Sequence, residues 1–254
     1  MSKVFTLAKN TFIEMLHEKL FFVVVIVAVL LFGLSFLLGA LSFDEQMKIL
    51  ADFGFLAIQL SSLGIALFSG SYLLSKEIEK QTCLLVLARP VSRDQFIVGK
   101  FLGVLILNTL LVLFLGLALA LLLGIDGNQL ISYLEICISL WLESTVILAL
   151  VLWLSLVIRP VLALAFGFVI FLLGHWLGDL AFFAEKSKEL VFINLIKVLH
   201  WIVPNFYRMN WKSSFYLKEG IAPSEFGWML IHTGGWVLIL ILAANYFFRR
   251  KDIV

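Results

Sequence analysis

The sequence has few charged residues and contains long runs with none. Of its 254 residues, 14% are charged and 62% are hydrophobic, and the mean hydropathy is +1.08. Soluble globular domains carry about 25% charged and about 45–50% apolar residues. A water-soluble fold of this composition would have to expose apolar surface on a large scale, so the composition indicates an integral membrane protein.

Motifs for several kinds of chemistry are also missing. The chain has neither H-E-x-x-H nor G-x-S-x-G, which mark zinc proteases and α/β-hydrolases. The only Gly-Lys pair, Gly99-Lys100, is followed by Phe101, so the phosphate-binding loop G-x-x-x-x-G-K-[ST] is missing too. Cys83 and Cys137 lie far apart without a C-x-x-C pattern, which indicates neither a disulfide framework nor a metal site. We therefore expect no catalytic, nucleotide or metal site in this chain.

Apolar runs long enough to cross a bilayer predict six spans. A membrane helix needs about 20 mostly apolar residues because the hydrocarbon core is about 30 Å thick. The runs of this length are 20–43, 53–75, 101–125, 131–158, 161–183 and 226–248. The fourth run carries Glu135 and Glu143, the fifth carries Asp179, and Pro160 separates these two runs because proline breaks a helix. We predict an all-α polytopic membrane protein whose residues 1–254 form one transmembrane domain.

The positions of Lys and Arg predict the orientation. An even number of spans places both termini on one side of the membrane. The segments on that side carry twelve Lys and Arg residues, whereas the short opposite loops 44–52 and 126–130 carry only Lys48. Lys and Arg are enriched on the cytoplasmic side, and a long loop such as 184–227 counts little in this bias. We therefore expect both termini in the cytoplasm.

Two shorter segments have the pattern of amphipathic helices. The first precedes the first span and has a polar stripe at spacings of three and four, formed by Lys3, Thr6, Asn10, Glu14 and His17. The second lies in the outer loop 184–227, where Asn194, Lys197 and His200 recur at every third position. It is too short to be a seventh span and contains a lysine. We predict that the first helix lies on the cytoplasmic face of the membrane and that the second lies in the membrane plane or is half inserted.

A mixed-charge insert, residues 76–100, separates the second and third spans. Its residues 82–88 form a short apolar helical piece, and Pro90 ends it. Ser92 with Gln95 matches a capping box, which predicts that a new helix begins there. The insert is therefore expected to consist of two helix ends joined by a short crosswise helix.

The apolar residues of this crosswise helix leave two interpretations open. The insert can be a solvated loop whose charges follow the positive-inside bias. Alternatively, Leu84 and Leu85 would be costly to expose to water and would enter a groove of a cytoplasmic partner.

The insert resembles the first cytoplasmic loop of type-2 ATP-binding-cassette (ABC-2) permeases. The family pattern is glutamate, glycine-threonine, paired leucines, proline-valine-serine-arginine and glycine-lysine. The matching residues here are Glu77, Thr82, Leu84-Leu85, Pro90-Val91-Ser92-Arg93 and Gly99-Lys100. The sequence departs at Gln81, where many members have glycine. The layout of spans and loops is similar as well, and "PNFYRMN" at 204–210 resembles the branch of the multi-copper-enzyme-maturation permeases.

This resemblance implies a function, partners and site residues. The chain would be the non-catalytic permease subunit of an ABC exporter in a bacterial cytoplasmic membrane, bound by lipid and by no nucleic acid. It would pair with a second permease chain, identical or paralogous, and with two copies of a cytoplasmic ATPase that bind ATP and Mg²⁺. The crosswise helix would be a coupling helix that inserts into the ATPase. The implied ATPase-coupling residues are Glu77, Thr82, Leu84, Leu85, Pro90, Arg93, Gly99 and Lys100.

The remaining hypotheses concern acidic residues inside the predicted spans. A charge at mid-bilayer costs about 2.5–3.5 kcal/mol on insertion scales, so Glu143 must face protein or a wet cavity. It either lines the translocation path or dimer seam, or it is a hydrogen-bonded glutamate between helices. We interpret Glu135 as solvated and His175 with Asp179, four residues apart, as an interfacial pair. An ion-coupled carrier or channel and an intramembrane enzyme are the alternative classes, although no internal repeat is evident.

The charge bias yields a topology prediction. In intact cells, a cysteine introduced in place of Arg250 should react only with a reagent that reaches the cytoplasm. A cysteine in place of Ser213 should react with a membrane-impermeant reagent added outside. If both sites react from the same side, six spans with cytoplasmic termini are ruled out.

Overall fold

The computed structural model of the chain describes all residues except 1–2, 42–45, 80–90, 188, 218–220 and 251–254. Within the described residues the regular structure is entirely helical. The helices are α1 (Lys3–Leu16), α2 (Lys19–Leu41), α3 (Gln46–Glu79), α5 (Arg93–Leu123), α6 (Gly127–Val157), α7 (Pro160–Ser187), α8 (Leu190–Ile202), the 3₁₀ helix η1 (Phe206–Met209), α9 (Ser214–Leu217) and α10 (Pro223–Arg250).

Local signals set several helix ends. The Ser92 side chain accepts a hydrogen bond from the backbone N–H of Gln95, and the Gln95 side chain accepts one from the backbone N–H of Ser92. This capping box begins α5 and confirms the prediction. Gly124 ends α5 in the left-handed conformation at φ 59°, which glycine adopts without steric cost. The predicted break before Pro160 is also confirmed, because α6 ends at Val157 and α7 begins at the proline.

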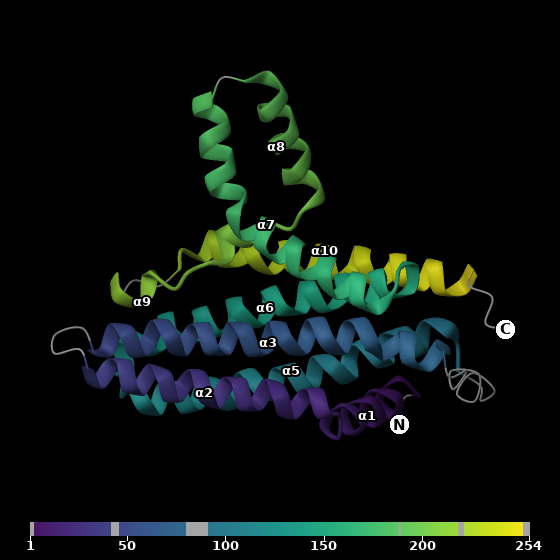
Figure 1. Cartoon of the computed structure of the whole chain (residues 1–254), viewed down its shortest axis with the longest axis horizontal. Coiled ribbons are helices and arrows are strands. Elements are labelled where there is room, and N and C mark those ends of the chain that lie inside the picture. The colour runs from purple at the N-terminus through teal and green to yellow at the C-terminus, as the bar shows by residue number, and fades with distance from the viewer. Residues whose placement is uncertain (1–2, 42–45, 80–90, 188, 218–220, 251–254) are drawn as a thin grey trace.

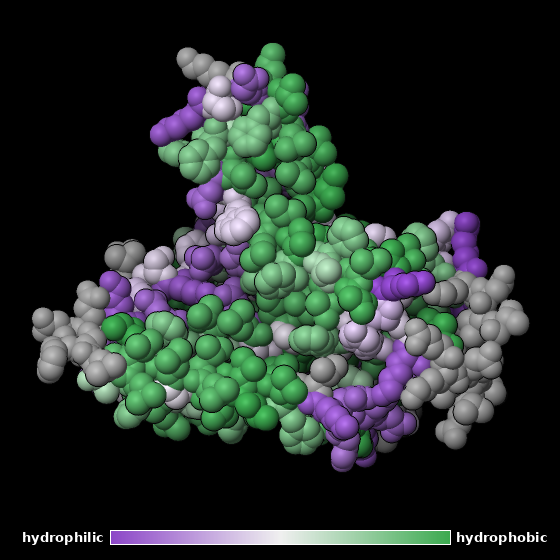
Figure 2. All heavy atoms as spheres, viewed as in Figure 1, coloured by the Kyte–Doolittle hydropathy of each residue, from purple (hydrophilic) through white to green (hydrophobic). Residues whose placement is uncertain are grey.

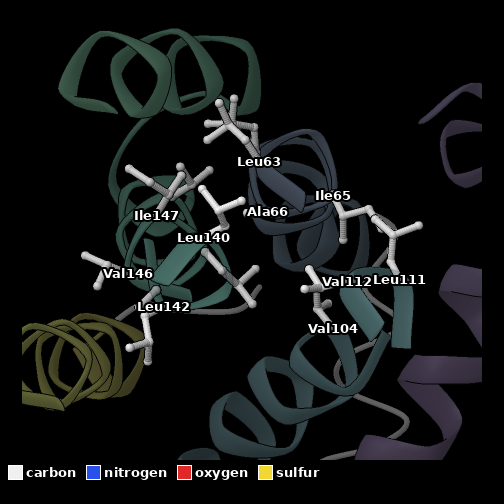
Figure 3. Close-up of a cluster of buried hydrophobic side chains, with 14 of the residues drawn as sticks. Leu63, Ile65, Ala66, Val104, Leu111, Val112, Leu140, Leu142, Val146 and Ile147 are labelled. Atoms are coloured by element: carbon white, nitrogen blue, oxygen red, sulfur yellow. The ribbon is translucent and has the colours of Figure 1, made fainter. Parts of the chain in front are cut away.

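The long helices form a bundle in which α3 and α6 are central (Figure 1). α3 packs against α2, α5, α6 and α7, and α6 also packs against α10. Apolar side chains fill the contacts between α3, α5 and α6 (Figure 3). Labelled members of this core are Leu63, Ile65 and Ala66 of α3, Val104, Leu111 and Val112 of α5, and Leu140, Leu142, Val146 and Ile147 of α6. α2 and α10 leave most of their apolar side chains partly or fully exposed, as helices in contact with lipid do.

The N-terminal helix α1 packs closely on the first turns of α5. A Cβ atom on Gly99 would lie 2.7 Å from the Cβ of Leu7, and one on Gly103 would lie 2.6 Å from the Cβ of Thr11. Real Cβ atoms do not approach so closely, so glycine at both positions allows the two helices to touch. Gly99, which the sequence assigned to the coupling pattern, therefore has a packing role in this structure.

The chain from the C-terminal part of α7 to the start of α10 does not follow the bundle axis. The C-terminal part of α7 turns away from the bundle and forms a hairpin with α8 that projects from it (Figure 1). Much of the hairpin surface is apolar (Figure 2), and Trp201 of α8 is 87% exposed. The chain then returns to the bundle through residues 203–216, which we call the distal segment because it lies away from the two termini.

The predicted number of spans is confirmed. Six helices among the described residues, namely α2, α3, α5, α6, α7 and α10, are long and apolar enough to cross a membrane. Leu190–Ile202 and Phe206–Tyr216 form a bent pair at 60°, which would count as a seventh only if the pair crossed as one unit. α1 and the C-terminal end of α10 lie toward one end of the bundle, here called the terminal end (Figure 1).

Candidate functional site

Two regions contain the predicted site residues, and the first is an ion cluster at the terminal end. Lys100 of α5 pairs with Glu77 of α3 and lies 3.2 Å from a carboxylate oxygen of Glu14 of α1. The Lys100 side chain is 6% exposed and that of Glu77 is 12% exposed. Lys76 beside them pairs with Glu18, and both of these side chains are more open to solvent. One buried ammonium thus joins three helices at the point where the insert leaves and re-enters the bundle.

Arg93 anchors the other side of the same region. Its guanidinium donates hydrogen bonds to the backbone carbonyls of Phe248 and Arg249 near the end of α10, at 3.2 and 2.8 Å. The neighbouring Asp94 forms an ion pair with Arg249, and the rings of Phe96 and Phe248 stack with centroids 5.5 Å apart. The first turn of α5 is therefore fastened to the last turn of α10.

The remaining residues of the predicted coupling site, Thr82, Leu84, Leu85 and Pro90, lie outside the described residues. The structure brings Glu77, Gly99 and Lys100 together at the base of the insert, and it places Arg93 at the start of α5. These contacts are internal to the chain. The coupling role of the whole set remains a prediction.

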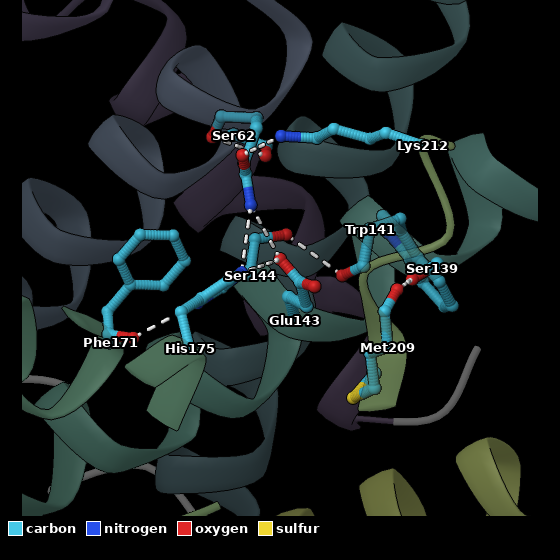
Figure 4. Close-up of polar contacts among 10 residues, drawn as sticks. Ser62, Ser139, Trp141, Glu143, Ser144, Phe171, His175, Met209 and Lys212 are labelled. Atoms are coloured by element: carbon cyan, nitrogen blue, oxygen red, sulfur yellow. Dashed lines mark hydrogen bonds and ion pairs between the residues drawn. The ribbon is translucent and has the colours of Figure 1, made fainter. Parts of the chain in front are cut away.

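The second region is a buried polar cluster around Glu143, here called the Glu143 cluster. Its members come from four elements: Gln59 of α3, Glu143 of α6, His175 of α7 and Lys212 of the distal segment (Figure 4). The Gln59 amide nitrogen donates to a Glu143 carboxylate oxygen at 2.9 Å, and the Gln59 carbonyl oxygen accepts from Lys212 at 2.5 Å. His175 Nε2 lies 3.6 Å from the same Glu143 oxygen.

Charge and burial in this cluster are unevenly matched. The Glu143 side chain is 1% exposed, and its second carboxylate oxygen, Oε1, has no hydrogen-bond partner among the described residues. Burial lowers the pKa of the Lys212 ammonium, while the negative charges of Glu143 and Asp52 act in the opposite direction. The described residues hold no group of three His, Cys, Asp or Glu side chains placed to bind a metal ion. The cluster is thus a network of hydrogen bonds and charges that joins four elements.

Further contacts hold the distal segment on the bundle. Ser139 of α6 donates to the carbonyl of Met209, and Glu135 of α6 accepts from the backbone N–H of Ile221 at 2.8 Å. Three more connections are a two-fold ion pair of Arg208 with Glu225 at 2.8 and 2.9 Å, a bond from the Asn205 backbone N–H to His232 at 3.2 Å, and a bond from Tyr216 to Asp52 at 2.6 Å.

The structure corrects two expectations about these residues. Glu135 is not simply solvated, because it accepts a hydrogen bond from the chain just beyond the distal segment. His175 does not pair with Asp179 but turns toward Gln59 and Glu143, while Asp179 is exposed. Sequence spacing could compare residues within one helix, but it gave no signal for partners on other helices. Gln59 and Lys212 were missed for the same reason.

The family to which the sequence belongs agrees with this architecture. The chain matches the family described as ABC-2 family transporter protein over residues 5–253. The match covers nearly the whole sequence, so the chain belongs to this family. It is therefore a multi-pass membrane protein and a permease subunit of an ABC transporter. No curated protein shows a significant match to the chain.

The ion cluster at the terminal end yields a stability prediction. Replacing Lys100 with Met leaves the carboxylates of Glu77 and Glu14 without their shared counter-charge. Removing one partner of a buried pair costs about 3–5 kcal/mol, so the free energy of unfolding in mixed micelles should fall by an amount of this order. Adding Glu77→Gln to Lys100→Met should restore part of the loss, because it removes one of the uncompensated charges.

Lys76→Met is the matched control for this experiment. It removes a lysine one residue from Glu77, but the Lys76 side chain is 42% exposed. Exposed ion pairs contribute about 0–1 kcal/mol, so this change should be nearly neutral. Equal losses from Lys76→Met and Lys100→Met would contradict the structural role assigned to Lys100.

Proposed function

We propose that this permease subunit forms half of the translocation path of an ATP-driven exporter in a bacterial cytoplasmic membrane. A second permease chain, identical or paralogous, supplies the other half, and two copies of a separate cytoplasmic ATPase supply the energy. The terminal end faces the cytoplasm, and the opposite end, where the distal segment lies, faces outside. The match to the ABC-2 family over 5–253 is the observation that carries this proposal.

Three features of the chain support the partner and the orientation. The sequence has no phosphate-binding loop, so ATP hydrolysis requires another chain. Lys and Arg are concentrated in the segments on the side of the termini, as cytoplasmic segments require. The described ends of the insert lie at the terminal end, where Lys100 binds Glu14 and Arg93 binds the end of α10. A force on the insert would therefore pass into α1, α3, α5 and α10.

We assign the contact with the ATPase to residues 82–88 of the insert. Buried apolar side chains contribute about 1.5–3 kcal/mol each, whereas exposed ion pairs contribute about 0–1 kcal/mol. The leucines should therefore dominate the binding, and the charged residues should hold the ends of the insert. Arg93→Ala should accordingly weaken the complex less than a charge placed at Leu84 or Leu85.

The test is co-purification of the permease with its ATPase and measurement of ATP hydrolysis in proteoliposomes. The permease alone should hydrolyse no ATP above background. Leu84→Asp and Leu85→Asp should each release the ATPase and abolish the activity that the permease stimulates. The control is Met47→Asp, because Met47 is an apolar side chain that is 61% exposed at the other end of α3. Normal binding and activity in both leucine variants would show that the insert is only a solvated loop.

We further propose that Glu143 belongs to the polar wall of the path or to the seam between two permease chains. Its support is the carboxylate oxygen Oε1, which is buried and has no hydrogen-bond partner among the residues that the structure describes. Glu143→Gln keeps the shape of the side chain and an acceptor for Gln59. It should assemble normally but lower the ATP hydrolysis that the permease stimulates.

Glu135→Gln is the matched control, since it makes the same change in the same helix and keeps an acceptor for the Ile221 N–H. Its activity should be normal. Full activity of Glu143→Gln would exclude a role of the carboxylate in the path and leave it a packing residue.

A further inference from the structure

The first two helices of the chain pack on different neighbours. α1 packs on α5, whereas α2 packs on α3. At their junction, the backbone N–H groups of His17 and Glu18 donate to the carbonyls of Glu14 and Met15, each three positions earlier and each at 3.2 Å. Steps of three residues interrupt the regular α-helical ladder. The chain bends there, and α1 turns away from the line of α2 (Figure 1).

A cavity lies at this bend among α1, α2, α3 and α5, and it is here called the wedge. Its volume is about 150 Å³, and its apolar walls include Phe21, Val24, Ile65, Phe68 and Leu107. Beside it α2 and α3 approach each other closely, since a Cβ atom on Gly64 would lie 3.3 Å from a methyl carbon of Val24. An apolar cavity of about 150 Å³ can hold a group as large as benzene. The wedge is thus large enough for part of one acyl chain.

The wedge is charged at one end and mostly apolar along the rest of its length. Residues that line it along α3 recur at spacings of three and four, namely Ile65, Phe68, Tyr72 and Lys76. From Ile65 to Lys76 the helix rises about 16 Å, which is about half of a hydrocarbon core about 30 Å thick. Tyr72 is 38% exposed and the Lys76 side chain is 42% exposed, so the wedge is open at the bundle surface. This arrangement fits a lipid with its headgroup at the terminal end and one chain along α3.

The ion cluster at the charged end has one negative charge in excess. The carboxylates of Glu14, Glu18 and Glu77 all act on Lys76. Lys76 pairs with Glu18 and Lys100 pairs with Glu77, so two ammonium groups face three carboxylates. Glu14 lies 3.2 Å from Lys100 and shares it with Glu77. The Glu14 side chain is 37% exposed and lines the wedge, so a cation that enters there meets a carboxylate whose charge is incompletely balanced.

Hydrogen bonding decides which kind of cation this carboxylate prefers. A primary ammonium group carries three N–H donors, as the side chain of lysine does. A quaternary ammonium group has the same charge but no N–H to donate. Hydrogen bonds between charged groups are roughly twice as strong as those between neutral groups. Lys76 donates one bond to Glu18, which leaves it donors for a phosphate oxygen.

We propose that the wedge binds a phospholipid whose headgroup carries a primary amine, as phosphatidylethanolamine does. Its ammonium group binds Glu14, its phosphate lies beside Lys76, and part of one acyl chain occupies the apolar walls. The lipid belongs to the membrane leaflet on the side of the termini, and it joins the bend between α1 and α2 to α3 and α5. This site goes beyond the proposed transport function and needs neither the ATPase nor a second permease chain.

The test is light-induced cross-linking with a lipid probe. The full-length chain is placed in phosphatidylcholine liposomes that contain a small fraction of phosphatidylethanolamine with a photoreactive diazirine in one acyl chain. After irradiation, peptide mapping should place the label on Phe21, Phe68 or Leu107. A phosphatidylcholine probe with the same chain should label these residues about tenfold less, because it lacks the charge-assisted hydrogen bond to Glu14. Unlabelled phosphatidylethanolamine should compete with the probe, whereas the anionic phosphatidylglycerol should not.

Two variants test the two ends of the wedge separately. Glu14→Gln keeps an acceptor for Lys100 but removes the excess charge, so labelling by the ethanolamine probe should fall to about the level of the choline probe. Ser69→Phe places a ring in the wedge, which Ser69 lines, so labelling by both probes should be lost. The matched control is Glu185→Gln, which makes the same change at an exposed position of α7 and should label like the unmodified chain. If Ser69→Phe fails to fold, Glu14→Gln and the comparison of the two probes still decide.

Three results would overturn the proposal. The first is labelling of other parts of the chain with none in the wedge. The second is equal labelling of the wedge by the ethanolamine and choline probes, which would make it ordinary lipid-facing surface. The third is an unchanged preference for the ethanolamine probe in Glu14→Gln. None of these measurements involves ATP hydrolysis or a partner chain, so the lipid site and the proposed function fail independently.

Discussion

A hydrocarbon environment offers no hydrogen bonds, so the polar groups within these spans can be satisfied only by one another. α6 meets this constraint along most of its length. Ser155 accepts a bond from Ser75 of α3 through its carbonyl at 3.3 Å, and Ser144 accepts one from Asn108 of α5 at 2.7 Å. Glu143, which precedes Ser144 in the helix, accepts a hydrogen bond from Gln59 of α3. Apolar packing fills the space between helices, whereas these bonds fix how the helices are aligned along one another.

The sequence predicted features that depend on neighbouring residues. Six spans follow from the lengths of the apolar runs, and the break at Pro160 and the capping box at Ser92 follow from local backbone chemistry. The partners of Glu143 could not be predicted in this way. Gln59 lies 84 positions from Glu143 and 153 positions from Lys212, so only the packing of whole helices brings them together. His175 was assigned to the wrong partner for the same reason.

The charges of the insert show how one residue pattern can serve two purposes. Glu77 and Lys100 match a family pattern for contact with a partner, and in the structure they bind each other in the interior. Gly99 and Gly103 bring α1 close enough for Glu14 to join them. A rigid base for the insert is what a docking helix at residues 82–88 would need. The sequence could not show that Glu77 and Lys100 bind each other, because they lie 23 positions apart on different helices.

The last helix, α10, binds the distal segment near its beginning and the start of α5 at its end. At its beginning, Glu225 and His232 hold Arg208 and Asn205 of the distal segment, and at its end the carbonyls of Phe248 and Arg249 receive Arg93 of α5. A continuous helix of 28 residues is about 42 Å long and is stiff along its axis. α10 is thus one helix that is bonded to another part of the chain near each of its ends. Rotation or sliding of this helix at one surface of the membrane would therefore reach the distal segment at the opposite surface.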